Sequence, residues 1–195
     1  MTLTPHHNSD VDIPLTVAVS TVDRWGTSEA SAPLVTTLPH TVIVIADATG
    51  DQPLVSGAAS GVEDAAIALP VTVTLQDTDG SETLSKVELT GIPHGATVSW
   101  SAANLPAGAT ATAVHTNPGD PASEITGWTF APADTTYAAT QALQTFLTKL
   151  SITPPPDSGA DFALTVKAYN VESNLSGLGG ATTATPFGTA AIHVT

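Results

Sequence analysis

Apolar and polar residues alternate over short stretches of the chain, which is the pattern of half-buried β-strands. In the clearest stretch, Val71, Val73 and Leu75 fall on one face, and Thr72 and Thr74 fall on the other. Similar alternation predicts further strands near residues 87–89, 96–100, 127–132, 162–168 and 190–194. The 15 Gly and 15 Pro residues supply turns between these runs. The pattern predicts an all-β fold of about seven short strands in two packed antiparallel sheets.

Two stretches depart from this alternation. Leu143, Phe146, Leu147 and Leu150 recur at the i, i+3, i+4, i+7 spacing that places side chains on one face of a helix. We therefore expect a short helix or helical turn there, packed on the sandwich. The segment 104–127 is rich in turn residues and is expected to form a long loop or an extra hairpin.

An internal repeat relates the two ends of the chain. The segment TLTPHHNSDVDIPLTV (2–17) aligns with SITPPPDSGADFALTV (151–166) at an offset of 149, and 7 of 16 positions are identical. A weaker match with small gaps relates PHTVIVI (39–45) to PFGTAAIHV (186–194). A period of this length is typical of whole domains in tandem, because solenoid units are much shorter.

The repeat predicts how the chain divides into domains. Residues 1–46 are expected to be the C-terminal part of one domain, so that Met1 falls inside a repeat, and residues 61–195 the complete next copy. Residues 47–60 are small and polar, as a short linker should be. A partial copy would expose a sheet edge and an apolar face. It would need to pair with another chain, lean on the complete domain, or belong to a split domain.

The charge of the chain narrows the choice of partners. It has 18 acidic and 4 basic residues, which give a formal net charge of −14. Such a charge repels nucleic acid and anionic membranes, so neither is expected as a partner, whereas metal cations are natural counterions. Solubility is the alternative reason for the acidity. No apolar run reaches the roughly 20 residues of a transmembrane helix, so membrane insertion is not expected, and the lack of Cys excludes thiol chemistry.

Three carboxylates follow the strand at 71–75 in the sequence DTDGSE. Asp77 and Asp79 leave the strand on the same side because side chains alternate, Gly80 permits a sharp turn, and Glu82 follows it. Calcium prefers about six to eight oxygen ligands and tolerates irregular geometry. The spacing differs from that of an EF-hand loop, but it fits a carboxylate cage at the edge of a domain.

Other acidic residues are candidate ligands of the same cage. They precede the first strand, lie in a loop that enters a later strand, or lie in the linker: Glu63, Asp64, Asp157, Asp161, Asp47 and Asp51. Crowded carboxylates raise one another's pKa, and a bound divalent ion removes that repulsion. The alternative is that DTDG is a solvated turn, because Asp and Gly both favour turns.

These motifs together resemble a known family. The segment GVEDAAIALPVTVTLQDTDGSETLSKVELTGIPHGATVS (61–99), followed by LSITPPPDSGADFALTVKAYNVES (150–173), is similar to the Ig-like or cadherin-like tandem repeats of giant bacterial adhesins. These adhesins are RTX-type, type I-secreted biofilm proteins. The resemblance covers nearly all of residues 51–195 and, as a partial copy, residues 1–46. Its most specific parts are the Glu-Asp pair before the first strand, the DxDGSE run and the Pro-rich turn followed by Asp-Phe-x-Leu-x-Val.

The resemblance implies a fold, a function and a set of ligands. The fold would be an antiparallel β-sandwich, and the function that of an extracellular spacer on the bacterial cell surface in cell adhesion and biofilm formation. Neighbouring repeats of the same chain would be its partners, and Ca2+ would stiffen it. The ligands implied by the resemblance are Glu63, Asp77, Asp79, Glu82 and Asp161.

Other chemistry has less support in the sequence. No G-x-S-x-G nucleophile motif is present, and we do not expect an enzyme. The six His residues are expected in loops or at the surface and not as zinc ligands. Trp100 and Trp128 fall in or at the ends of predicted strands and are expected in the core. The alternative function is an Ig-like module that binds a carbohydrate or protein through the loop 104–127 or Trp25.

Overall fold

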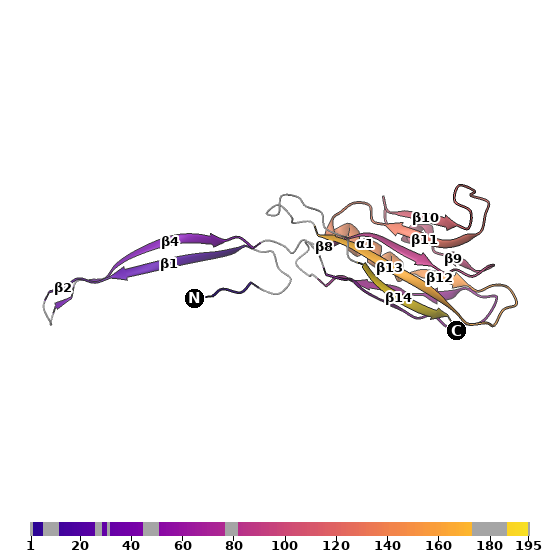
Figure 1. Cartoon of the computed structure of the whole chain (residues 1–195), viewed down its shortest axis with the longest axis horizontal. Helices are drawn as coiled ribbons and strands as arrows, with labels where there is room; N and C mark the ends of the chain where they lie inside the picture. Colours follow the sequence, from indigo (N-terminus) through magenta and orange to yellow (C-terminus); the bar gives the residue numbers. More distant parts are fainter. Residues whose placement is uncertain are drawn as a thin grey trace.

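The computed structural model describes residues 2–5, 12–25, 29–30, 32–44, 51–76, 82–172 and 187–194. The fold is mostly β, and all of its strand pairs are antiparallel, which confirms the all-β prediction. It consists of a long two-stranded ribbon and a sandwich-like body, from which the ribbon extends away (Figure 1).

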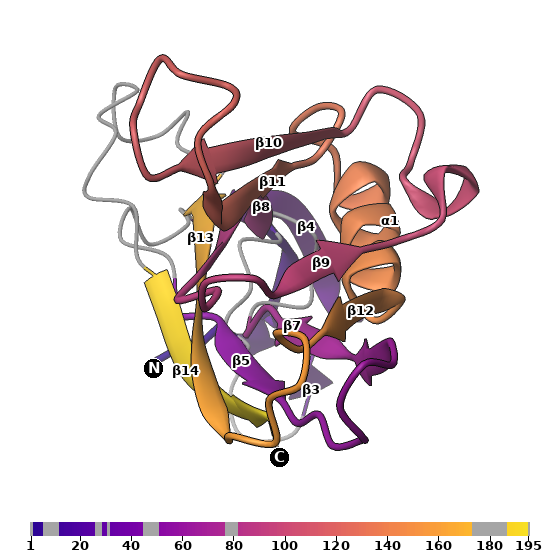
Figure 2. The ribbon, with the colours of Figure 1, turned by 90° about the vertical axis from the view of Figure 1, so that its right-hand side faces the viewer.

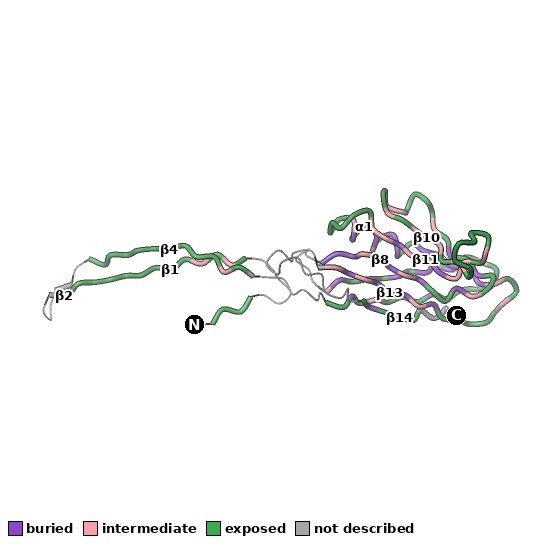
Figure 3. The backbone as a smooth tube through the Cα atoms, turned by 45° about the horizontal axis from the view of Figure 1, so that its top comes forward, coloured by how far each residue is buried: buried purple, intermediate pink, exposed green. Residues whose placement is uncertain are grey.

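The ribbon is formed by β1 (Ile13–Thr21) and β4 (Leu34–Val42). Ile13 lies opposite Val42, and Thr21 lies opposite Leu34. A short pair, β2 (Arg24–Trp25) and β3 (Glu29–Ala30), lies between these strands in the sequence. Most of the ribbon is exposed, in contrast to the body of the molecule (Figure 3).

The body is built from a five-stranded sheet and shorter sheets that face it. The order of the five-stranded sheet is β10 (Thr110–His115), β11 (Ile125–Ala131), β8 (Glu82–Thr90), β13 (Phe162–Glu172), β14 (Phe187–Val194). The shorter sheets are β6 (Ile67–Leu69), β12 (Leu150–Thr153), β9 (Thr97–Ser99), and the pair β5 (Leu54–Gly57), β7 (Val71–Thr74). The segment 104–127, expected as a loop or a hairpin, contributes β10 and pairs it with β11.

The inward faces of the strands form the core that the alternation predicts. The buried residues on these faces include Val71, Val73, Val87, Leu89, Leu164, Val166 and Ala168. Between β11 and β12 the chain forms α1 (Tyr137–Leu147), which begins where the Thr136 side chain accepts a hydrogen bond from the Ala139 amide (3.2 Å). The helix lies along one side of the body (Figure 2) and buries Leu143, Phe146 and Leu147. The helical prediction is confirmed, except that Leu150 begins β12.

An aromatic cluster joins the five-stranded sheet to α1. The ring of Trp100 meets the edge of Trp128 at a centroid distance of 4.8 Å, and Phe130 lies 5.5 Å from Phe146 of α1. A short 3-10 turn, η1 (Ala102–Asn104), follows Trp100. Both tryptophans are half-buried and pack against the core, as expected from their positions in the sequence.

The linker predicted over residues 47–60 is wrong in its second half. Leu54–Gly57 form β5, which pairs with β7, and Ala59 is buried in the core. The chain therefore joins the body by residue 51 and not by residue 61. Alternation does not predict this strand, because the two apolar residues of LVSG, Leu54 and Val55, are adjacent and Leu54 is exposed. Asp47, by contrast, lies outside the described residues.

Candidate functional site

The predicted ligands that the structure describes lie at opposite ends of the body. Asp161 directly precedes β13, whereas Glu82 pairs with Glu172 at the other end of that strand. β13 has 11 residues, and at about 3.3 Å per residue it separates Asp161 from Glu172 by roughly 36 Å. The six predicted residues that the structure describes therefore do not converge on one cage. Asp47, Asp77 and Asp79 lie outside the described residues.

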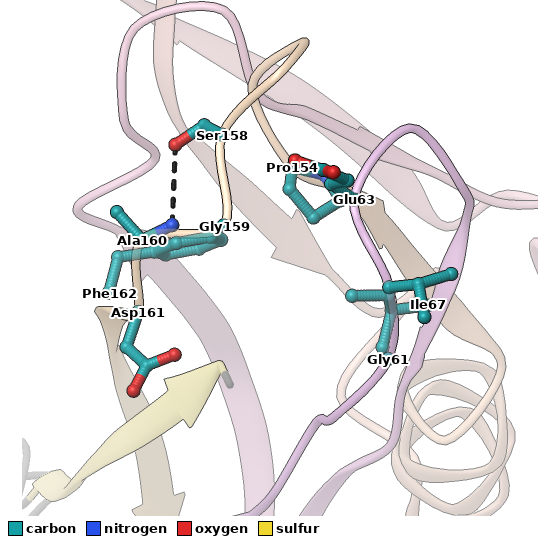
Figure 4. A pocket seen from close by; sticks show the side chains of 10 residues that line it. Gly61, Glu63, Ile67, Pro154, Ser158, Gly159, Ala160, Asp161 and Phe162 are labelled. Carbon is teal, nitrogen blue, oxygen red and sulfur yellow. Dashed lines mark hydrogen bonds between the residues drawn. The ribbon is translucent and has the colours of Figure 1, made fainter.

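At the Asp161 end lie four exposed carboxylates, two of which line a small pocket. Glu63 and Asp161 line this pocket, which measures about 70 Å³, and they lie on different sides of it (Figure 4). Asp64 accepts a hydrogen bond from the Asp157 amide (3.1 Å). Within the described ranges, no group of three Asp, Glu, His or Cys side chains is arranged to hold a metal ion.

At the opposite end, Glu82 is fully buried. Its Oε1 atom accepts hydrogen bonds from the Asp51 amide (3.0 Å) and from Asn170 Nδ2. Asn170 Nδ2 also donates to the Asp51 carbonyl (2.7 Å). The structure thus brings together two of the predicted residues, Glu82 and Asp51, but Asp51 takes part through its backbone. Because Glu82 is buried beside Asn170, whereas the carboxylates at the Asp161 end are exposed, this end is the stronger candidate for a cation site.

Asn170 is the residue of this cluster that sequence reasoning missed. It is fully buried, and its Oδ1 atom has no hydrogen-bond partner in the part of the chain that the structure describes. An unsatisfied buried oxygen costs about 1–3 kcal/mol. The available signal was its place on β13, where it continues the inward series of Leu164, Val166 and Ala168 with a polar side chain.

The geometry of this cluster is compatible with a bound cation. Asn170 Nδ2 donates to two oxygens, the Asp51 carbonyl and Glu82 Oε1. These two oxygens could instead coordinate a cation. A half-turn of the amide would exchange this donor for Oδ1. The cluster would then offer one carboxylate, one amide and one carbonyl oxygen, which are all ligand types of calcium. These three groups would hold the ion only with further oxygen ligands from elsewhere.

A second polar cluster covers the outer face of the five-stranded sheet. Lys86 Nζ lies 2.6 Å from Glu88 Oε1 and 4.5 Å from the centre of the Tyr169 ring, and the Tyr169 hydroxyl donates to Glu88 Oε2 (3.0 Å). Partial burial opposes ionisation of Glu88, but the hydrogen bonds from Lys86 and Tyr169 and the charges of Lys86 and Lys167 outweigh it and lower its pKa. Burial and the hydrogen bond to Glu88 raise the pKa of Tyr169.

The Tyr169→Phe substitution is expected to raise the pKa of Glu88, because it removes one of the hydrogen bonds that favour the carboxylate. A lowered folded-state pKa stabilises the fold above the unfolded pKa, and this contribution is lost as the pH falls through the folded pKa. The variant should therefore lose less stability on acidification. Carbon-13 NMR titration of the Glu88 carboxyl measures the shift, and Tyr137→Phe on the exposed start of α1 is the matched control. An unchanged Glu88 titration would show that the hydrogen bond from Tyr169 does not lower the pKa of Glu88.

Three histidines, His40, His94 and His115, occupy exposed or partly exposed positions. His94 Nδ1 lies 2.7 Å from Glu124 Oε1, and His115 Nδ1 lies 2.7 Å from the carbonyl of Ser123. His40 lies on the exposed strand β4. His94 and His115 thus contact the adjacent residues Glu124 and Ser123, but no group of three potential metal ligands occurs among the residues that the structure describes.

Comparison with known proteins does not assign the chain to a class. No protein-family model matches it, and no curated protein matches its sequence. Across the described ranges, no helix combines the length and apolar character needed to cross a membrane.

Proposed function

We propose that the chain is a calcium-stabilised extracellular repeat of a large bacterial surface adhesin, which acts as a non-catalytic spacer in cell adhesion and biofilm formation. The observation that carries the calcium site is the buried cluster of Glu82, Asn170 and the Asp51 backbone, with the unpartnered Asn170 Oδ1. The adhesin assignment rests on the resemblance of segments 61–99 and 150–173 to such repeats. The domain would be an Ig-like or cadherin-like sandwich.

The position of the cluster supports a stiffening role. Asp51 stands where the described chain enters the body, after the ribbon, while Glu82 and Asn170 belong to the neighbouring strands β8 and β13. An ion held here would tie the entry of the chain to the central strands of the large sheet. In the sequence, Asp47 precedes this point, and Asp77 and Asp79 precede Glu82, so further carboxylates are close along the chain. We expect them to complete the ligand set.

The packing of the tryptophans supports a spacer over a sugar-binding module. Trp100 contacts Trp128, Phe130 and Phe146 at centroid distances of 4.8, 5.6 and 5.8 Å. A ring that packs edge-to-face against three other rings stabilises the core, and its faces are not free to stack on a sugar.

Calcium is expected to stabilise the domain against unfolding. Extracellular calcium modules bind with Kd values of about 10⁻⁴–10⁻³ M, and about 100-fold excess over Kd adds roughly 2.7 kcal/mol. For a body of this size, the gain corresponds to a rise in Tm of roughly 5–10 °C. Thermal unfolding followed by circular dichroism, in EDTA and in excess calcium, measures the difference. Magnesium at equal ionic strength is the control, and equal midpoints in EDTA and calcium would refute the calcium site.

A further inference from the structure

We infer that the β1–β4 ribbon is a docking surface for the remaining strands of another sandwich, in a unit that repeats residues 51–150 and is joined to the N-terminal side of the ribbon. A strand equivalent to β8 would pair antiparallel with the free edge of β1, and the apolar face of the ribbon would close the core of that unit. This inference rests on the proposed function, in which residues 1–46 end a preceding repeat.

The ribbon has the same register as the last hairpin of the body. The alignment at offset 149 makes Ile13 the counterpart of Phe162, and both residues begin the first strand of an antiparallel hairpin. Ile13 lies opposite Val42, and Phe162 lies opposite Val194. From these pairs, both hairpins run without a register shift, so that Val17 lies opposite Leu38 as Val166 lies opposite Ala190. The β1–β4 ribbon is thus the structural counterpart of β13–β14.

The two hairpins differ in what covers their apolar faces. In the body, Val166 and Ala168 are 0% exposed because the smaller sheets cover them. Their counterparts in β1 are Val17 and Val19, which are 51% and 55% exposed, and Leu38 of β4 is 65% exposed. The opposite face of the ribbon carries mainly Pro, Thr, Ser and Ala. The uncovered face is therefore the one that forms the core in the complete copy.

The free edge of β1 identifies the strand that would bind it. In the body, β13 lies between β14 and β8, and Val166 pairs with Leu89 of β8. Within the described chain, β1 pairs with β4 alone. A residue equivalent to Leu89 is therefore expected opposite Val17. A two-stranded ribbon with an open edge is marginally stable by itself, so this pairing would also stabilise the ribbon.

A copy of residues 51–150 can serve as the partner of the ribbon in a test, provided that one ribbon residue, Thr36, is replaced. Gly188 of β14 has no side chain, and a Cβ atom there would collide with the carbonyl of Pro53. Its counterpart in the ribbon is Thr36, which lies opposite Val19 as Gly188 lies opposite Ala168. The ribbon used in the test should therefore carry Thr36→Gly, so that the Pro53 carbonyl of the added copy has room beside β4.

The test compares two proteins that both carry Thr36→Gly. One is the chain itself, and the other is a joined chain in which an extra copy of residues 51–150 is placed directly before residue 2. This junction follows the alignment, since Thr2 is the counterpart of Ser151. In the joined chain, hydrogen exchange of the β1 amides should slow by about 100-fold or more, as in a folded core strand. The expected result also includes loss of dye binding to the apolar face of the ribbon.

The matched control is Val17→Asp in both chains. Val17 is half-exposed in the unjoined chain, so the substitution should leave its unfolding midpoint unchanged, whereas in the joined chain it should abolish the slow exchange of β1. Equal β1 exchange in joined and unjoined chains, with the body intact, would overturn the inference. A dimeric unjoined chain with protected β1 amides would also overturn it, because a second copy would then cover the ribbon. Both measurements are made in EDTA, so their failure is distinguishable from failure of the calcium proposal.

Discussion

The Phe130→Ala substitution is expected to destabilise the body by about 3–5 kcal/mol, the range for removing a fully buried aromatic side chain. Phe130 is 0% exposed and lies on β11, next to the central strand β8. Its ring centroid lies 5.6 Å from Trp100, 6.4 Å from Trp128 and 5.5 Å from Phe146 of α1. Removing the ring would leave a cavity between the sheet and the helix and would take a partner from three other aromatic rings.

Urea unfolding at 25 °C, followed by circular dichroism and by tryptophan fluorescence, measures this loss. Val114→Ala is the matched control, because Val114 is 40% exposed on the neighbouring strand β10 and should change stability by less than about 0.5 kcal/mol. The fluorescence of Trp100 and Trp128 should also shift in the Phe130 variant before unfolding. A loss below about 1 kcal/mol, smaller than any expected for such a cavity, would show that the cluster does not hold the helix to the sheet.

The core of this fold follows from the sequence because its strands carry few exceptions to strict alternation. In β7, β8 and β13, a side-chain period of two assigns Val71, Leu89 and Val166 to the buried face without any knowledge of the partner strands. The helix was predictable for the same reason, since Leu143, Phe146 and Leu147 share one face at a different period. Both signals are local, and tertiary packing reinforces them.

The candidate site could be predicted only in part, because alternation does not reveal which end of a sandwich a residue reaches. Glu63 and Glu82 are 19 positions apart in the sequence, yet the strands between them carry them to different ends. The contribution of Asp51 depends on a backbone contact, and no side-chain pattern encodes such a contact. Asn170 differs from both cases, because its position two residues after Ala168 places a polar side chain on the inward face of β13.

The Glu82→Ala substitution is expected to lower the free energy of unfolding strongly, because Glu82 lies at the end of the body that carries the buried cluster. The substitution removes the acceptor of the Asp51 amide and of Asn170 Nδ2 inside a buried cluster. Because each of these two donors left unsatisfied costs about 1–3 kcal/mol, the loss in EDTA should be about 2–6 kcal/mol. In calcium the difference from the unsubstituted chain should widen by roughly 2.7 kcal/mol at about 100-fold excess over Kd, since the variant lacks the carboxylate ligand.

The Glu63→Ala variant is the matched control at the other end of the body. Glu63 is exposed, and its removal should change stability by less than about 0.5 kcal/mol and leave the response to calcium intact. Chemical unfolding of the unsubstituted chain and of both variants, each in EDTA and in calcium, gives the six free energies needed. If Glu63→Ala abolishes the calcium response and Glu82→Ala keeps it, the ion binds beside Asp161 and the buried cluster is structural. If both keep it, neither Glu82 nor Glu63 is a calcium ligand and the proposed site is wrong, because a true ligand cannot be removed without loss of affinity.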